Sequence, residues 1–276
     1  NHRLITDITQ PMATTSRSRA FDLYCRQTYL DNVLRGGLPT RIGPHTVYVF
    51  CRKHGDLERD YNQFLLPPTP YSQGHSNYRD VTQNRRTDVW FHPEIGECNI
   101  ITFFNLIQPD GFNPLVFKGL RCQAPELARE IPQLQDILAR PFSPGELLQA
   151  VVHRRVALGE PPAAFLARVV SQATLVEEAE HGEGFWTDHW TYHLDLLESY
   201  LALYPERLRA LLLEQRVFTF YDNPFIVVPR AQKYQHTPQG IRQLHAVRRD
   251  PEKTELIQSR DAVPNRARTD HGRGGV

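Results

Sequence analysis

The feature that most constrains the fold of this chain is a run of amphipathic helical segments, punctuated by prolines, between Pro125 and Glu214. Apolar residues recur there at the spacing of a helix that is buried on one face. The spacing predicts helices over about 125–138, 144–156, 163–179 and 188–214. Ser143-Pro-Gly-Glu146 predicts a capped helix start, and Pro205 predicts a break or kink in the last helix. Short connections make such helices antiparallel neighbours, so we expect a mainly α fold.

The first half of the chain combines helices with a few short strands. A helix is predicted over 21–34, where Gly36-Gly37 supplies the stop. A β-branched and aromatic run at 46–51 predicts a strand. The other predicted elements are a helical turn over 56–64 and a helix over about 79–91. The segments 217–221 and 225–228 are predicted to form either a strand pair or two extended segments around a turn.

Charge and cysteine content exclude several classes of protein. Thirty-two Lys and Arg residues oppose 31 Asp and Glu residues, and this formal charge of +1 gives no field that recruits nucleic acid or an anionic membrane. No stretch approaches 18 uninterrupted apolar residues, and the first 20 residues have no apolar signal-peptide core. The four cysteines form no C-x-x-C pair, which indicates reduced thiols in a cytoplasmic protein. We expect neither nucleic acid nor a membrane as a partner.

The C-terminal segment differs in composition from the rest of the chain. Residues 230–276 hold ten Lys or Arg against five Asp or Glu, and few apolar side chains. Such a segment cannot build a core of its own. We therefore predict a folded domain over 1–229 and a polar, extended tail over 230–276 that continues beyond Val276.

The first candidate site lies in the segment Gln73–Arg86, which mixes amide, carboxylate and guanidinium side chains with Tyr78. A sugar presents hydroxyl groups that donate and accept hydrogen bonds, so sugar sites combine these side chains with an aromatic ring. Residues four apart share one face of a helix, which would gather four polar side chains into one patch. The four are Arg79, Asp80, Gln83 and Asn84. The alternative is a solvated first turn in which the helix dipole favours Asp80.

The second candidate site is Gly182–Tyr192, at the start of the long Leu-rich helix. Aromatic rings beside Asp188, Trp190 among them, are typical of a wall on which the apolar face of a sugar stacks. In the alternative, Asp188 or the residue before it caps the helix and the aromatic rings fill the core. His189 and His193 have a spacing that suits a metal, but no Glu of an H-E-x-x-H motif and no third ligand accompany them, so no metal is predicted.

Three segments resemble a known family. Tyr78-Arg-Asp-Val-Thr-Gln-Asn84 resembles the Y-R-D-x-x-Q-D segment of the inverting sugar phosphorylases of glycoside hydrolase family 94, which includes cellobiose phosphorylase. Phe185-Trp-Thr-Asp-His-Trp190 is similar to the F-x-D-D-x-x-W segment of that family. Arg26-Gln-Thr-Tyr29 occupies the place of the helix before the family's substrate loop. The three segments come in the family's order over about residues 20–205.

The resemblance implies a fold and a set of site residues. The fold is a partial (α/α)6 barrel of the six-hairpin glycosidase type, with a few short strands, that ends before the barrel closes. Two departures bear on sugar specificity and activity: Asn84 stands where the family has Asp, and Thr187 replaces the first Asp of F-x-D-D. The residues implied to bind substrate are Arg79, Asp80, Gln83, Asn84, Asp188 and Trp190.

The implied reaction is phosphorolysis of β-glucosides or β-glucans. The expected partners are an oligosaccharide or glucan and inorganic phosphate as co-substrate, with no other cofactor. One carboxylic acid protonates the glycosidic oxygen while phosphate attacks the anomeric carbon. Asp188 has the W-x-D spacing of the family's acid segment without the Leu-Asn that follows, so we expect the general acid beyond Val276. Two alternatives stay open: an inverting glycoside hydrolase of the same fold, and a non-catalytic glycan-binding or structural fragment.

Overall fold

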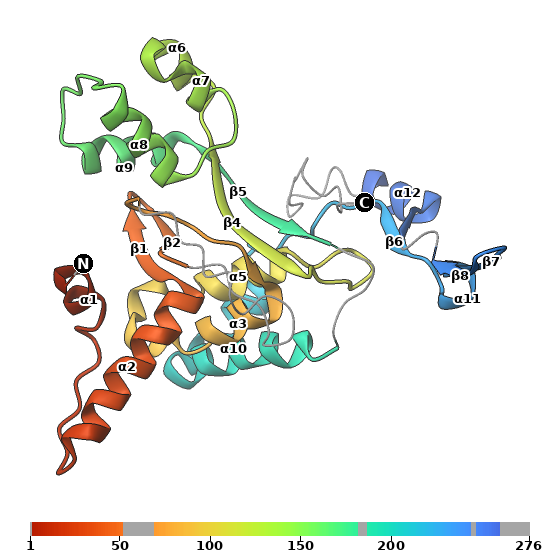
Figure 1. The fold of residues 1–276 in the computed structure, drawn as a ribbon, viewed down its shortest axis with the longest axis horizontal. Coiled ribbons are helices and arrows are strands. Elements are labelled where there is room, and N and C mark those ends of the chain that lie inside the picture. The colour runs from red at the N-terminus through yellow and green to blue at the C-terminus, as the bar shows by residue number, and fades with distance from the viewer. Residues whose placement is uncertain (1, 52–68, 182–186, 244–246, 260–276) are drawn as a thin grey trace.

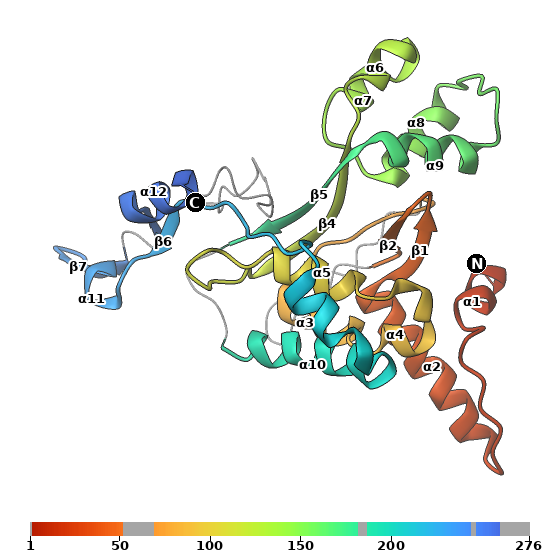
Figure 2. The same ribbon diagram turned by 180° about the vertical axis from the view of Figure 1, so that it is seen from behind.

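The computed structural model describes residues 2–51, 69–181, 187–243 and 247–259, and Figure 1 shows its fold. A central body of helices and strands is continued upward by two long antiparallel strands, β4 (Val116–Gln123) and β5 (Thr174–Glu180). These strands lead to a group of helices within residues 127–172, which we call the helical lobe. Viewed from behind, the C-terminal elements lie beside the body, away from the N-terminal helices (Figure 2).

The N-terminal part consists of two helices and a hairpin. Helix α1 (His2–Ile8) precedes α2 (Arg19–Gly36), whose first turn is capped by the Ser18 hydroxyl accepting from the Phe21 amide at 3.2 Å. The predicted helix over 21–34 is therefore confirmed. Strands β1 (Leu38–Ile42) and β2 (His45–Val49) form the hairpin, which agrees with the strand predicted at 46–51. The helical turn predicted over 56–64 lies outside the described residues.

The next elements form the base of the body. The short strand β3 (Ser76–Asn77) leads directly into α3, and the predicted helix over 79–91 is interrupted at Arg86-Thr87. Two helices therefore replace the predicted one, and Thr87 is the N-cap residue of the second. The helices are α3 (Tyr78–Arg85), α4 (Asp88–Phe91), the 3₁₀ turn η1 (Pro93–Ile95) and α5 (Cys98–Asn105).

The central sheet contains a strand where the sequence predicts a helix. Strands β3, β4 and β5 pair antiparallel in that order, with a register shift at Gly119, whose φ is 101°. The helix predicted over 163–179 ends early, because residues 174–180 pair along β4. Hydrogen bonding to β4 therefore overrides the local helical pattern of Leu175–Ala179.

The helical lobe packs on its own apolar core. Pro132 splits the helix predicted over 125–138, because proline cannot donate the backbone hydrogen bond inside a helix. The capped start at Ser143 is confirmed, since its hydroxyl accepts from the Glu146 amide at 3.2 Å. The elements are α6 (Leu127–Glu130), η2 (Pro132–Leu134), α7 (Gln135–Leu138), α8 (Pro144–His153) and α9 (Pro162–Gln172).

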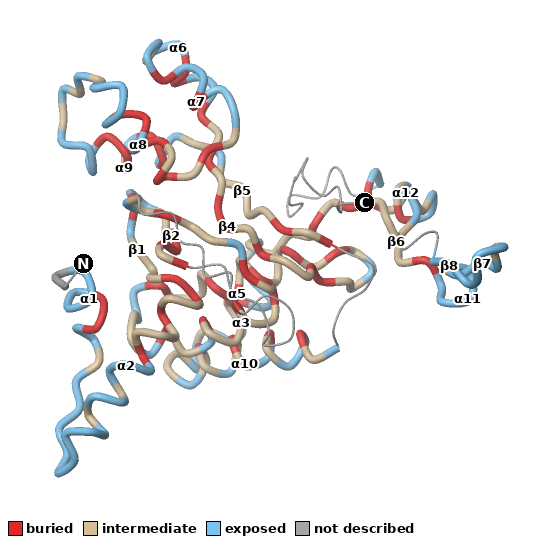
Figure 3. Tube along the Cα trace, viewed as in Figure 1, coloured by how far each residue is buried: buried red, intermediate tan, exposed pale blue. Residues whose placement is uncertain are grey.

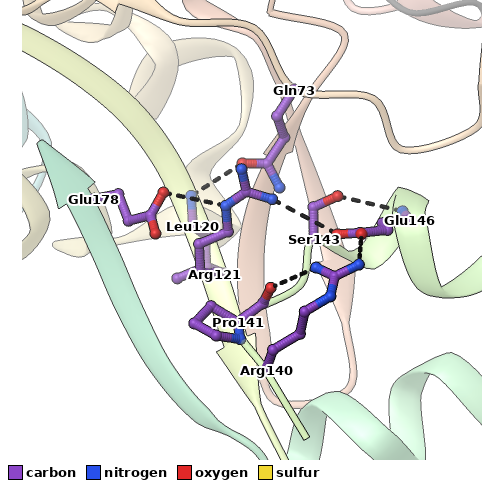
Figure 4. Close-up of polar contacts among 8 residues, drawn as sticks. All are labelled: Gln73, Leu120, Arg121, Arg140, Pro141, Ser143, Glu146 and Glu178. Atoms are coloured by element: carbon purple, nitrogen blue, oxygen red, sulfur yellow. Dashed lines mark hydrogen bonds and ion pairs between the residues drawn. The ribbon is translucent and has the colours of Figure 1, made fainter. Parts of the chain in front are cut away.

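An ion-pair network joins the lobe to the sheet (Figure 4). Arg121 of β4 lies between two carboxylates, with its Nε 3.1 Å from Glu178 of β5 and a terminal nitrogen 3.9 Å from Glu146 of α8. Glu146 also accepts a hydrogen bond from Arg140. The network fixes the first turn of α8 against the ladder of β4 and β5.

The long Leu-rich helix and the C-terminal elements complete the described chain. Helix α10 (His189–Leu203) ends before the 3₁₀ turn η3 (Pro205–Arg207) and the π-helical turn η4 (Ala210–Glu214), so the break at Pro205 is confirmed. Of the two alternatives for 217–221 and 225–228, the strand pair is wrong, because β6 pairs with β9 and residues 217–221 form no strand. The elements are β6 (Phe225–Val227), α11 (Arg230–Lys233), β7 (Tyr234–Thr237), β8 (Gly240–Gln243), β9 (Val247–Arg249) and α12 (Pro251–Ser259).

Buried residues gather in the body and in the lobe, as Figure 3 shows. One cluster joins the β1–β2 hairpin to the lobe, and another packs α3 and α5 against α10. Helices predominate over strands, so the mainly α prediction is confirmed in this coarse form. The helices in the described ranges do not enclose a barrel. Among the described helices, none is long and apolar enough to cross a membrane.

Candidate functional site

The two predicted sugar-binding segments meet where α3 and α10 begin. Tyr78, the first residue of α3, is fully buried, and its hydroxyl donates to the Phe103 carbonyl at 2.7 Å. Because that proton is used, His193 of α10 donates its Nε2 hydrogen to the Tyr78 oxygen at 2.6 Å. The Tyr78 ring also packs against His189, one turn earlier on α10, at 5.2 Å between centroids. Aromatic packing thus fixes the two helix starts beside each other.

Four polar side chains form the outer part of this junction, and we call them the α3–α10 surface. The Arg79 Nε lies 3.2 Å from an Asp80 oxygen on α3. On α10 the Tyr192 hydroxyl donates to Asp188 Oδ2 at 3.3 Å. The charge of Asp188 acts on Arg79, so the two pairs lie within electrostatic reach across the helices. The α3–α10 surface consists of Arg79, Asp80, Asp188 and Tyr192.

Electrostatic coupling across the surface is visible in two pKa shifts. Partial burial disfavours the charged Arg79 guanidinium, but Asp80 and Asp188 more than offset this and raise the pKa of Arg79. Burial, followed by the Asp188 carboxylate, raises the pKa of Tyr192, so its hydroxyl stays protonated at neutral pH. The surface therefore offers a permanent cation, carboxylate acceptors, and a neutral hydroxyl whose oxygen can accept while its proton is donated to Asp188.

His189 lies directly behind the surface. It is 1 % exposed, and its Nδ1 lies 2.5 Å from the side-chain carbonyl oxygen of Asn113, which can only accept. Burial lowers the pKa of His189 to about 4, although Asp188 opposes the shift. The ring is therefore neutral at pH 7, with Nδ1 as the donor and Nε2 as a buried nitrogen that has no hydrogen-bond partner among the described residues. Asp188 Oδ1 is likewise buried without such a partner.

The remaining predicted residues lie around this surface. The Asn84 side chain donates to the Asp80 carbonyl at 2.6 Å, and the Asn84 backbone carbonyl accepts from Asn32 of α2 at 2.9 Å, so Asn84 ties α3 to α2. Gln83 is half-buried on α3. Trp190 is 45 % exposed, with its ring 5.4 Å from that of His193. The structure thus brings Arg79, Asp80 and Asp188 together, whereas Trp190, two residues after Asp188, lies in the same turn on a different face of α10.

The structure also bears on the alternatives for these segments. The Asp188 side chain makes no cap hydrogen bond to the start of α10. Phe185 and Trp186, the first residues of the segment similar to F-x-D-D-x-x-W, lie outside the described residues. His189 and His193 are held by Asn113 and Tyr78, and no group of three or more His, Cys, Asp or Glu side chains suited to a metal occurs in the described part of the chain.

A second polar cluster, which sequence reasoning missed, lies inside the body. Arg85 at the end of α3 is 4 % exposed, stacks 3.6 Å above the Tyr48 ring, and donates from Nε to the Gly36 carbonyl at 2.6 Å. Asn99 of α5 donates to the Tyr48 hydroxyl at 2.7 Å. The Arg85 charge acts on two buried carboxyl groups, and these belong to Asp88 and Glu177.

Both carboxyl groups of this inner cluster resist ionisation. Burial raises the pKa of Asp88 to about 7, although Arg85 and the Tyr48 and Asn99 side chains oppose the rise. Burial also raises the pKa of Glu177 to about 7 against the same Arg85 charge. The only signal in the sequence is the pair Glu177-Glu178: in a strand, alternation turns one of two adjacent residues inward. The helical pattern of this segment hides that signal.

Comparisons of the chain with family models, with curated proteins and with solved structures found no match.

Proposed function

We propose that the chain binds the glucosyl unit of a β-glucoside or β-glucan at the α3–α10 surface, as part of a carbohydrate-active protein of the inverting phosphorylase type. The observation that supports this most is the meeting of Arg79 and Asp80 with Asp188 and Tyr192, which are more than one hundred residues away in the sequence. Segments singled out separately as sugar-binding therefore share one surface.

The chemistry of this surface suits a neutral, hydroxyl-rich ligand. Each sugar hydroxyl donates one hydrogen bond and accepts others, so it pairs with carboxylates and with a guanidinium at once. Asp188 Oδ1 is a buried acceptor without a partner among the described residues, and Arg79 is a permanent donor beside it. Trp190 presents an exposed ring in the first turn of α10, on which the apolar face of a pyranose can stack.

The proposed reaction transfers the glucosyl unit to inorganic phosphate. Phosphate attacks the anomeric carbon, the glycosidic bond breaks, and a carboxylic acid gives its proton to the leaving oxygen. We propose Asp188 as a substrate-binding residue of this reaction. The proposal includes the fold, with α3 and α10 as inner helices of an (α/α)6 barrel. Four cysteines, none of which forms a disulfide in the described part of the chain, support a cytoplasmic setting.

The experiment combines binding with turnover. The 276-residue chain is titrated with cellobiose in a calorimeter and is incubated with cellobiose and inorganic phosphate, and glucose 1-phosphate is then measured. Saturable cellobiose binding supports the proposal, and phosphate-dependent release of glucose 1-phosphate extends it to catalysis by this chain. Release of glucose without phosphate would identify an inverting hydrolase instead, and the absence of both binding and turnover would contradict the proposal.

A further inference from the structure

A cavity of about 640 Å³ lies between the β1–β2 hairpin, α5 and the ladder of β4 and β5, and none of its lining residues belongs to the α3–α10 surface. Its lining is mixed in character. Thr46, Thr102 and Glu177 supply polar groups, and Leu120 and Leu175 supply an apolar wall. The volume is within the usual range for sites that bind small molecules.

The cavity adjoins a small inner hollow of about 20 Å³ that reaches the inner polar cluster. Glu177, Thr102 and Leu120 line both spaces, and Gln73 and Arg85 line the inner one. The Arg85 guanidinium is already engaged with the Tyr48 ring and the Gly36 carbonyl. The inner end of the cavity is therefore polar, whereas one side wall is apolar.

Two buried polar atoms at this inner end have no hydrogen-bond partner among the described residues. Gln73 is held in place because its Oε1 accepts from the Leu120 amide at 2.9 Å, as Figure 4 shows, and this leaves Nε2 unpartnered. Glu177 Oε1 accepts from the Thr102 hydroxyl at 3.5 Å, and Oε2 is left unpartnered. Gly119 makes room for Gln73, since a Cβ there would overlap the Gln73 amide.

Both unpartnered atoms act as donors at neutral pH or below. The Gln73 amide nitrogen can only donate. Burial raises the pKa of Glu177 to about 7, so a large share of its carboxyl groups carries a proton. An unsatisfied buried donor is unfavourable, and a ligand oxygen that accepts from both atoms would relieve both.

We propose that this cavity is a second binding site, separate from the α3–α10 surface, for a small neutral polyhydroxylated molecule such as a monosaccharide or polyol. Gln73 and Glu177 donate to one hydroxyl oxygen of the ligand, and Thr102 contacts the same end. Leu120 and Leu175 pack against the apolar carbon face of the ligand. A sugar ring matches this combination because its hydroxyl edge and its C–H face lie on different sides.

The test uses glucose as the probe and a background chain in which two carboxylates of the α3–α10 surface are replaced. Calorimetric titrations are run on the full chain carrying Asp80→Asn and Asp188→Asn, and again after adding Glu177→Leu, Glu177→Gln or Glu178→Gln. Glu178 is the matched control because it is the next residue of β5 and pairs with Arg121 instead of lining the cavity. Thermal unfolding of each variant shows that the fold is retained.

The proposal predicts that glucose still binds in the background chain. Glu177→Leu weakens this binding at least tenfold, because it removes the carboxyl donor, whereas Glu177→Gln keeps a donor and changes it less than threefold. Glu178→Gln leaves it unchanged. The proposal is overturned if the background chain binds no glucose, or if Glu177→Leu binds as tightly as the background chain. Loss of glucose binding through Asp80→Asn and Asp188→Asn alone would support the α3–α10 surface and reject the second site.

Discussion

The Tyr78 hydroxyl lies 2.6 Å from His193 Nε2 in the interior between α3 and α10, and it donates its own proton to the Phe103 carbonyl. A single oxygen thus joins three helices immediately behind the α3–α10 surface. The arrangement holds the two helix starts at a fixed separation, which is what a sugar site with groups from both helices requires.

This relationship predicts the effect of Tyr78→Phe. The variant leaves the His193 N–H and the Phe103 carbonyl buried without a partner, which should lower the free energy of unfolding by about 1–3 kcal/mol. Chemical denaturation measures this loss. Tyr192→Phe is the matched control, because Tyr192 is half-buried and the loss of its hydroxyl should change stability by less than about 0.5 kcal/mol. Equal stability of Tyr78→Phe and the unmodified chain would contradict the assigned hydrogen bonds.

The buried histidines predict a loss of stability in acid. Burial, followed by the charge of His189, lowers the pKa of His193 to about 4. The unfolded chain binds this proton near pH 6.5 and the folded chain does not, so the stabilisation is complete above about pH 6.5 and is lost as the pH falls towards 4. Glutamine cannot titrate. Between pH 7 and pH 4, the free energy of unfolding of His193→Gln should therefore fall by up to about 3 kcal/mol less than that of the unmodified chain. Unfolding free energies measured across this range test the difference.

A matched control for the acid titration is His153→Gln. His153 is exposed on α8, so this variant makes the same His-to-Gln change outside the core. Identical pH profiles for His193→Gln and the unmodified chain would show that His193 is not buried in its neutral form.

Burial of Asp88 predicts the opposite pH dependence of the free energy of unfolding. Its folded-state pKa of about 7 lies above the unfolded value, so its stabilisation is complete below about pH 4 and is lost as the pH rises through 7. Asp88→Asn imitates the protonated form. Relative to the unmodified chain, this variant should gain up to about 4 kcal/mol of stability between pH 4 and neutral pH, which denaturant titrations at each pH measure. The control is Asp136→Asn. Because Arg154 lowers the pKa of the Asp136 carboxylate to about 2, any effect of this variant on the pH dependence of stability appears only in stronger acid.

The contacts of Lys253 predict that α12 is held against the loop after α5. Its ammonium is buried, lies 2.8 Å from Asp110, and also contacts Gln108 and the Phe225 carbonyl. Lys253→Ala leaves these acceptors without their cation, so amide hydrogen exchange in α12 and around Asp110 should accelerate at least tenfold. Glu255→Ala, an exposed change on the same helix, should leave exchange unaltered. Unchanged protection in Lys253→Ala would show that α12 does not depend on this contact.

Local signals in the sequence predicted some elements well. Ser143 ahead of Pro144 and Glu146 marks the start of α8, and Pro205 marks the end of α10, because caps and prolines act on adjacent backbone groups. Strand β5 was missed because its partner, β4, lies about fifty residues earlier, and only pairing reveals it.

The candidate sites show the same difference between features that local sequence predicts and features that depend on tertiary packing. Arg79 and Asp80 are adjacent in the sequence and were predicted to share one patch, whereas their approach to Asp188 depends on the packing of α3 against α10. The inner cluster was not visible, because Arg85 meets Glu177 through the packing of α3 against the central sheet. Burial of a charged residue is a property of tertiary packing, and no local pattern encodes it.

The most direct test of the central claim is the dissociation constant for cellobiose, measured by calorimetry, of the unmodified chain, Asp80→Asn, Asp188→Asn and the control Asp195→Asn. Asp195 lies on α10 and pairs with Arg86 at 2.9 Å, outside the α3–α10 surface. The account predicts that Asp80→Asn and Asp188→Asn each raise the constant at least tenfold, about 1.4 kcal/mol, with unchanged thermal unfolding, while Asp195→Asn does not. Cellobiose binding that is equally tight in Asp80→Asn, Asp188→Asn and the unmodified chain would contradict it.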